Sequence, residues 1–296
     1  MEKPVLFIYN PGAGKGKIKS SLSDVLVVLS AMGRPIVVHP TAAVRDATHY
    51  IATQGANYSL IVCSGGDGTF SECINGLLEL PKESRPGLGY LPAGTTNDCA
   101  ASLKLSTNPI EAAKNAVFGK PFSMDVGKLN NRYFTYVAAF GAFTNVSYDT
   151  PQNLKNTLGQ LAYVVNGAMQ LPNLRTHHVR VTFDGQVVED DFIYGMISNS
   201  ESVAGIKGLT GKDVFLHDGV FELTLVKEPK KLSDYADILT ALTTVGHQSP
   251  LVTTAKVSRL HLHFDEPMSF TLDGEYGGHY TDVTVHTIPR AVNIIK

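Results

Sequence analysis

Apolar and polar positions follow two different patterns along the chain. Up to about residue 125, short β-branched and aromatic runs at residues 5–9, 35–39 and 58–62 alternate with stretches of helical spacing. Those stretches are residues 18–32, 44–53, 70–80 and 109–118, and another short strand begins at residue 89. This order predicts a βαβαβ unit, in which helices cover both faces of a parallel sheet and ligands bind at the carboxyl ends of the strands.

After residue 126 the pattern changes to short segments in which apolar and polar residues alternate. The segments are residues 179–183, 192–197, 221–226, 256–264, 268–272 and 283–287. They predict a mainly antiparallel β domain, with helical spacing only at residues 152–171 and 233–245. We therefore expect an α/β domain over residues 1–125 and a β-rich domain over 126–289. Whether residues 290–296 return to the first domain stays open.

Composition and charge narrow the function classes. A chain of 296 residues is long for a single core, which favours two domains. The balance of 25 Lys and Arg against 27 Asp and Glu gives no reason to expect a nucleic-acid partner. Three cysteines without metal-ligand spacing indicate reduced thiols in a cytoplasmic protein. No secretory signal and no apolar run of about 18 residues is found, so we expect a soluble protein.

The most informative segment is Cys-Ser-Gly-Gly-Asp-Gly-Thr at residues 63–69, which lies between a strand and a helix. Its three glycines allow close approach of a ligand, and the free N–H groups of the following helix point at the turn. A phosphate group fits this arrangement. Asp67 would repel a bare polyphosphate, so its presence favours a Mg²⁺ ion, water or a hydroxyl between the two.

Two more glycine loops follow predicted strands, at residues 10–17 and 91–98. The first is not a P-loop, because Gly16-Lys17 is followed by Ile18 and not by Ser or Thr. A glycine turn without a ligand would explain one such loop, and a helix cap would explain one polar residue of the other. Three such loops at three strand ends together predict a nucleotide site.

The motifs Asn-Pro-Gly-Ala-Gly from residue 10, Ser-Gly-Gly-Asp-Gly-Thr from residue 64 and Leu-Pro-Ala-Gly-Thr-Thr-Asn-Asp from residue 91 occur together with a late Leu-Asp-Gly-Glu from residue 272. In this order they resemble the diacylglycerol kinase catalytic-domain family, with sphingosine kinases more distant. The Gly-Gly-Asp-Gly-Thr motif alone also occurs in NAD kinases and phosphofructokinases. The resemblance implies that the first domain has the parallel-sheet fold of NAD kinases and phosphofructokinases. It also implies that ATP donates its γ-phosphate to a lipid hydroxyl.

The resemblance also implies the roles of individual residues. Nucleotide contacts fall on Asn10, Pro11, Gly12, Ala13, Gly14, Thr41, Gly65, Gly66, Asp67, Gly68, Thr69, Phe70, Ser71 and Thr95. Asp67 is expected to be catalytic by organising Mg²⁺ and the phosphates. The proton acceptor is expected to be Asp273 or Glu275, with a slight preference for Asp273. An ordinary Asp-Gly hairpin turn is the alternative at that position.

Related bacterial lipid kinases hold a structural Mg²⁺ in a segment similar to residues 209–215 of this chain. Carried over, the ligands are the side chain of Asp213 and the backbone carbonyls of Thr210 and Phe215. Ligation by oxygen alone suits Mg²⁺. A plain Gly-Lys-Asp turn is the alternative.

Three functions compete at this point. The first is an ATP-dependent kinase of diacylglycerol or a similar neutral lipid, which is cytoplasmic and contacts the inner membrane face transiently. The second is a kinase of a soluble acceptor such as NAD, which leaves the loop at residues 10–14 and the Asp273–Glu275 turn without a role. The third is a nucleotide-binding regulator without catalysis. A homodimer stays open.

Overall fold

The computed structural model describes residues 2–141, 175–203, 206–207, 214–244 and 247–296. The expected helix at residues 152–171 lies outside these residues, as do Thr210 and Asp213. The chain forms two compact units. Unit 1 consists of Met1–Val126 and Pro289–Lys296, and unit 2 of Gly127–Ile288.

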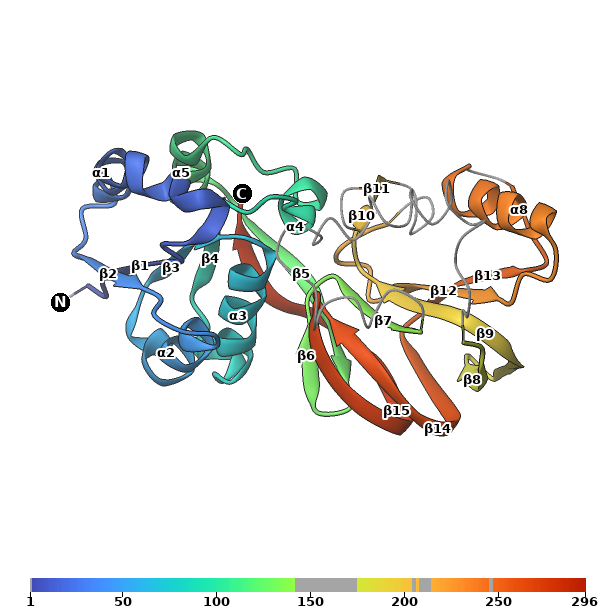
Figure 1. The fold of residues 1–296 in the computed structure, drawn as a ribbon. Coiled ribbons are helices and arrows are strands. Elements are labelled where there is room, and N and C mark those ends of the chain that lie inside the picture. The colour runs from blue at the N-terminus through green and yellow to red at the C-terminus, as the bar shows by residue number, and fades with distance from the viewer. Residues whose placement is uncertain (1, 142–174, 204–205, 208–213, 245–246) are drawn as a thin grey trace. The chain divides into compact units, whose positions relative to one another are not determined.

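Unit 1 is built on four parallel strands. They are β1 (Val5–Tyr9), β2 (Ile36–Pro40), β3 (Leu60–Gly65) and β4 (Gly87–Pro92), in the order β2-β1-β3-β4. Helices α1 (Lys17–Ser30) and α5 (Pro109–Phe118) lie on one face, and α2 (Asp46–Gln54) and α3 (Asp67–Leu78) lie on the other (Figure 1). The predicted parallel sheet is therefore present, and its strands end at one edge together.

Successive side chains of the central strands point to opposite faces of the sheet, so each residue packs against the helices on its own face. Leu60 and Val62 of β3 pack with Ile18, Val25 and Leu29 of α1 and with the alanines of α5. Short 3-10 helices precede α1 (η1, Ala13–Gly16), follow α2 (η2, Gly55–Asn57) and follow α3 (η3, Lys82–Ser84). A short helix, α4 (Asp98–Ser102), follows the loop after β4. Helices α1 and α5 therefore pack against one face of β1, β3 and β4.

The end of the chain returns to unit 1. Strand β15 (Glu275–Ile295) pairs with β4 in parallel through Ile294 and Ile295, and Lys296 exchanges two backbone hydrogen bonds with Lys120. The buried carboxylate of Asp125 on β5 (Pro121–Leu129) accepts a 2.7 Å hydrogen bond from the amide of Arg290. These contacts add the last residues to the first sheet.

Unit 2 is mainly antiparallel. Its strands are β6 (Arg132–Phe134), β7 (Val137–Gly141), β8 (His177–Phe183), β9 (Gln186–Ser198), β12 (Phe221–Lys227), β13 (Val252–Val257), β14 (Arg259–Leu272) and most of β15, with a small pair β10 (Ser202–Val203) and β11 (Ile206–Lys207) and a helix α8 (Leu232–Thr243). Every strand pairing within this unit is antiparallel among the described residues. One core of aromatic and branched aliphatic residues fills it.

Several predicted segments have different limits in the structure. The two runs at residues 256–264 and 268–272 belong mostly to one strand, β14, because a bulge between His263 and Met268 keeps them in register with β15. The strands β5 to β7 were not predicted as separate elements. The middle of β5 and all of β7 are buried on both faces, which removes the alternation on which the prediction depends, and β6 has only three residues.

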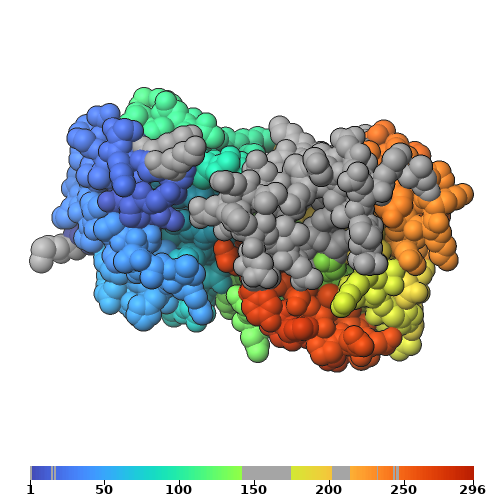
Figure 2. All heavy atoms as spheres, viewed as in Figure 1, coloured from blue at the N-terminus to red at the C-terminus, as the bar shows by residue number. Residues whose placement is uncertain are grey.

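Cys63, Cys73 and Cys99 are all buried, and none of the three forms a disulfide with another described cysteine. No helix in the described part of the chain is both long and apolar enough to cross a membrane. The exposed sides of α2, in light blue, and of α8, in orange, form part of the face seen in Figure 2.

Candidate active site

Backbone hydrogen bonds join the carboxyl ends of the four parallel strands in unit 1. The amide of Thr41, just after β2, donates to the last residue of β1 at 2.8 Å, and the amide of Asn10 donates to Ser64 at 2.9 Å. The amide of Ala93 donates to the carbonyl of Gly65 at 2.7 Å. The three glycine loops and Thr41 therefore lie side by side at one edge of the sheet.

The turn from β3 to α3 requires its first glycine. A Cβ at Gly65 would lie 2.4 Å from the side chain of Thr69, which is too close for any other residue. Helix α3 begins at Asp67 with Gly66 at its N-cap and no side-chain cap. Its first N–H groups are therefore available to a ligand, and the helix dipole favours an anion there.

The Asp67 carboxylate binds another loop of the protein. Its two oxygens accept hydrogen bonds from the amides of Asp98 at 3.2 Å and Cys99 at 3.0 Å, which are the first two residues of α4. Burial raises the pKa of Asp67, and these two hydrogen bonds lower it in part. Asp67 thus fixes the end of the loop at residues 91–98 against the glycine turn.

The same loop is closed by Asn97, which the sequence marked only as one of several polar residues. Asn97 adopts a left-handed backbone conformation with φ of 55°. Its side chain accepts from the amide of Gly94 at 2.8 Å and donates to the carbonyl of Gly94 at 2.9 Å. Gly94 in turn lies against Gly66, because a Cβ at Gly94 would approach the Gly66 Cα to 2.7 Å. The loop and the turn are therefore one rigid assembly.

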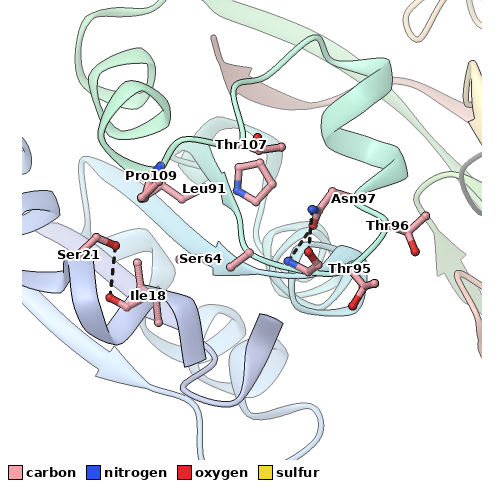
Figure 3. A pocket seen from close by; sticks show the side chains of 12 residues that line it. Ile18, Ser21, Ser64, Leu91, Thr95, Thr96, Asn97, Thr107 and Pro109 are labelled. Carbon is pink, nitrogen blue, oxygen red and sulfur yellow. Dashed lines mark hydrogen bonds between the residues drawn. The ribbon is translucent and has the colours of Figure 1, made fainter. Parts of the chain in front are cut away.

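A cavity of about 290 Å³ lies beside this assembly on the side of α1 and α5. Figure 3 shows side chains from α1, from the loop after β4 and from the segment before α5 around it. The lining residues are Ile18, Ser21, Ser64, Leu91, Pro92, Ala93, Gly94, Thr95, Thr96, Asn97, Thr107 and Pro109. Among the residues expected to contact nucleotide, Thr95 is the one that lines it.

Two residues of the expected nucleotide set have side chains committed to the protein interior. Phe70 is fully buried, and its ring stacks on Tyr90 with centroids 4.4 Å apart. Ser71 is buried in α3, and its carbonyl accepts from the Asn75 side chain at 2.9 Å. The side chain of Phe70 therefore shapes α3 and is not positioned for a ligand. The proximity of both residues to the turn reflects their helix position.

In unit 2 the Asp273–Glu275 segment is the turn between β14 and β15. Leu272 pairs with Glu275, and both central residues have positive φ, 52° at Asp273 and 84° at Gly274. This is the hairpin geometry that an Asp-Gly pair favours. The alternative of a hairpin turn therefore describes the backbone correctly, and the role of the two carboxylates depends on their surroundings.

These surroundings differ. Asp273 is 7% exposed, and its carboxylate accepts three hydrogen bonds from the consecutive amides of Thr135 at 2.7 Å, Tyr136 at 3.0 Å and Val137 at 3.2 Å. Glu275 is exposed two residues later. The carboxylate of Asp273 therefore fixes the turn to the segment between β6 and β7, and that of Glu275 faces solvent.

The expected structural Mg²⁺ site lies mostly outside the described residues. Of its three expected ligands, only Phe215 is described, and its ring is 52% exposed with Lys256 Nζ 5.5 Å from the ring centroid. Within the described ranges, no three or more His, Cys, Asp or Glu side chains gather as metal ligands would.

Two family models match almost the whole chain. Residues 4–129 match the diacylglycerol kinase catalytic domain. Residues 138–296 match the YegS C-terminal NAD kinase beta sandwich-like domain. The first match contains the three glycine loops, and the second contains the Asp273–Glu275 turn.

Curated proteins and solved structures that are similar to this chain are described as diacylglycerol kinases. Diacylglycerol kinases of Staphylococcus saprophyticus and Bacillus subtilis are 36% and 35% identical over 280 residues, which cover 94% and 93% of this chain and 90% and 91% of theirs. A solved structure from Bacillus anthracis described as a candidate diacylglycerol kinase is 29% identical, with a TM-score of 0.85 over 99% of this chain and 95% of that one. Another Bacillus anthracis structure, described as a diacylglycerol kinase, has a TM-score of 0.78 and 26% identity over 99% and 96%. The chain therefore belongs to the diacylglycerol kinase family and is a lipid kinase, with ATP as the substrate that the family implies.

Proposed function

We propose that this protein transfers the γ-phosphate of ATP to the free hydroxyl of diacylglycerol and so forms phosphatidic acid. The observation that carries the proposal is the assembly of three glycine loops at one sheet edge in a chain of this family. The names of the relatives support diacylglycerol as the acceptor. A kinase of NAD would leave the Asp273–Glu275 turn without a role.

The nucleotide phosphates would bind the glycine turn and the loop at residues 10–14. Gly68, in the first turn of α3, is exposed, and a Cβ built there would meet nothing within 4 Å. The protein itself therefore does not require glycine at this position, and the space is available to a ligand that approaches the helix N-terminus. Asn10 shapes the other loop, since its side chain accepts from the Gly12 amide at 2.9 Å.

Mg²⁺ would bind mainly through the nucleotide phosphates and water, as it does where a site supplies one or two carboxylates. The residues present fit this role. The Asp67 carboxylate accepts the amides of Asp98 and Cys99 and a hydrogen bond from the Cys99 side chain, and a carboxylate offers about four lone-pair sites, so it can still face a cation or its water. The ion would neutralise charge on the phosphates. Asp67 would hold the metal and the loop at residues 91–98 in one geometry.

Glu275 would accept the proton of the lipid hydroxyl. Phosphoryl transfer passes through a loose transition state, so late proton transfer to an ordinary carboxylate is sufficient. Asp273 already accepts three N–H groups, so its oxygens are committed to the backbone of a neighbouring segment. These contacts support Glu275 in place of Asp273, which the sequence slightly favours. We assign Asp273 to positioning and Glu275 to proton transfer.

The lipid acceptor lies in a membrane, so the enzyme would contact the membrane surface transiently. An assay with radiolabelled ATP and Mg²⁺ tests the proposal against vesicles that contain diacylglycerol, with sphingosine and NAD in parallel reactions. Labelled phosphatidic acid as the dominant product supports it. Preferential labelling of NAD, or no labelled product with active ATP binding, contradicts it.

A further inference from the structure

The cavity on the side of α1 and α5 is lined by a buried hydroxyl group that has no hydrogen-bond partner among the described residues. Ser64 is 1% exposed, and its Oγ makes no hydrogen bond. It precedes Gly65 at the end of β3. Because Leu60 and Val62 of the same strand pack toward α1 and α5, strand alternation points Ser64 to that face as well. Ser64 lines the cavity there (Figure 3).

Burial of an unsatisfied hydroxyl is unfavourable, and native proteins satisfy most such groups. Ser64 therefore indicates a ligand group at this position. An alanine would pack equally well at the end of an otherwise apolar strand. The hydroxyl can both donate and accept, so the rest of the lining decides which chemistry it meets.

The lining favours a small oxyanion. Helix α1 has 14 residues, and its N-terminus at Gly16 and Lys17 has no side-chain cap and no acidic residue in its first turn. Ile18, in that first turn, lines the cavity, and the lining contains no carboxylate. The hydroxyls of Thr95 and Thr107 offer further donors, whereas that of Ser21 donates to the carbonyl of Ile18 at 3.5 Å. Uncapped N–H groups, a helix dipole and hydroxyl donors together are the chemistry that recognises phosphate.

We propose that this cavity is a phosphate-binding subsite in which the Ser64 hydroxyl donates to a phosphate oxygen. The inference rests on the proposed function, since the subsite adjoins the nucleotide loops through Thr95. The subsite lies on the face of the sheet that α1 and α5 cover, opposite to α3. Ser64 is on β3 and Thr41 follows β2, so β1 separates the two residues in the sheet. The phosphate is either the terminal phosphate of the nucleotide or the phosphate of the lipid product, which have the same chemistry.

Ser64→Ala tests the assignment, with Ser23→Ala on the exposed side of α1 as the matched control. The probes are inorganic phosphate, ADP, the ATP analogue AMP-PNP and short-chain dihexanoyl phosphatidic acid, each titrated by calorimetry. We expect Ser64→Ala to weaken at least one phosphate ligand about tenfold or more, as loss of a hydrogen bond to a charged group does. Weakening of AMP-PNP but not ADP identifies the nucleotide phosphate, and weakening of phosphatidic acid identifies the product.

Thermal melting gives a second measurement that a purely structural serine would not produce. Without phosphate, Ser64→Ala should melt at or above the wild-type temperature, because an unsatisfied group has been removed. With phosphate, the rise in melting temperature seen in wild type and Ser23→Ala should be lost. If Ser64→Ala does not fold, Ser64→Cys, which keeps the volume but donates weakly, takes its place.

Unchanged affinity for all four probes would overturn the subsite. That result would leave the proposed kinase reaction intact if lipid phosphorylation by wild type is observed. The converse result is that wild type phosphorylates no lipid while Ser64→Ala loses phosphate binding. That combination would support the subsite and contradict the proposed function. The two ideas therefore fail separately.

Discussion

Two aspartates, one in each unit, occupy glycine-containing turns and bind the backbone of a neighbouring segment. Asp67 of unit 1 accepts two amides at the start of α4, and Asp273 of unit 2 accepts three consecutive amides before and within β7. Both residues belong to motifs that sequence reasoning assigned to catalysis. In both places the carboxylate also fixes the position of the neighbouring segment through backbone hydrogen bonds.

The difference lies in what each carboxylate can still do. Asp67 is half-buried, and burial raises its pKa despite the hydrogen bonds from the Asp98 and Cys99 amides and the Cys99 side chain, so it can respond to a cation. Asp273 is 7% exposed with three donors, and an exposed glutamate follows two residues later. We therefore propose that Asp273, which is buried beneath three backbone donors, is a positioning residue, and that the half-buried Asp67 remains available for chemistry.

The largest expected effect is that of Asp67→Asn. The variant loses the charge that would hold Mg²⁺ and keeps only one acceptor oxygen for the α4 amides. We expect kcat for lipid phosphorylation to fall about 10²- to 10³-fold, the range seen when one electrostatic contact to the transition state is removed. Circular dichroism and melting should show a folded protein. Asp24→Asn, on an exposed position of α1, serves as control.

Wild-type kcat in Asp67→Asn would remove the distinction between the two aspartates. Asp67 would then be a structural cap alone.

The next effect separates the two carboxylates of the unit 2 turn. Glu275→Gln should lower kcat about a hundredfold, with ATP affinity and stability unchanged, because a general base has been removed. Asp273→Asn should instead lower the free energy of unfolding by about 1–3 kcal/mol, because it leaves buried amides without acceptors. Steady-state kinetics and urea unfolding measure both. Glu266→Gln, an exposed position on β14, is the neutral control.

The outcome that contradicts this assignment is a stable Asp273→Asn that has lost activity beside a fully active Glu275→Gln. Asp273 would then accept the proton.

A buried carboxylate in unit 2 offers a comparison in which burial outweighs the contacts that stabilise the charge. Glu222 on β12 is 6% exposed, Lys256 Nζ lies 3.9 Å from it, and burial raises its pKa from 4.5 to about 7. The folded state therefore binds the proton more tightly than the unfolded state, and the free energy of unfolding falls as pH rises from about 4.5 to about 7.

Glu222→Gln removes this pH dependence. Above pH 7 the variant should be more stable than wild type by about 1–3 kcal/mol, and near pH 4 the two should be similar. Thermal melting across this pH range, with the exposed Glu228→Gln as control, measures the difference. A constant difference at every pH would show that Glu222 does not titrate in this range.

The smallest expected effect concerns the loop that Asp67 fixes. Asn97→Ala loses both hydrogen bonds to Gly94 and places alanine at φ of 55°. It should destabilise unit 1 by about 1–2 kcal/mol. Asn97→Gly loses the same bonds but tolerates the backbone conformation, so it should be less destabilised. Urea unfolding distinguishes the variants, and equal stability of the two would show that the left-handed conformation costs nothing here.

The sequence by itself determined the local structure of unit 1. Apolar runs of β-branched residues, separated by stretches of helical spacing, specify β1 to β4 and their helices. The reason is that apolar side chains at helical spacing share one buried face only if the segment is a helix, and short β-branched runs are buried best as strands. The glycine loops and their order also follow from the sequence, and they were sufficient to indicate a nucleotide site and the family.

The tertiary structure decided which distant groups each motif residue contacts. Local pattern could not show that Asp273 accepts amides of residues 135–137, since those donors lie more than a hundred positions away in the sequence. It could not show that Ile294 pairs with β4, that Phe70 stacks on Tyr90, or that Ser64 is left without a partner beside a cavity. Each of these depends on which distant segment supplies the neighbouring atoms, and that information exists only once the chain has folded.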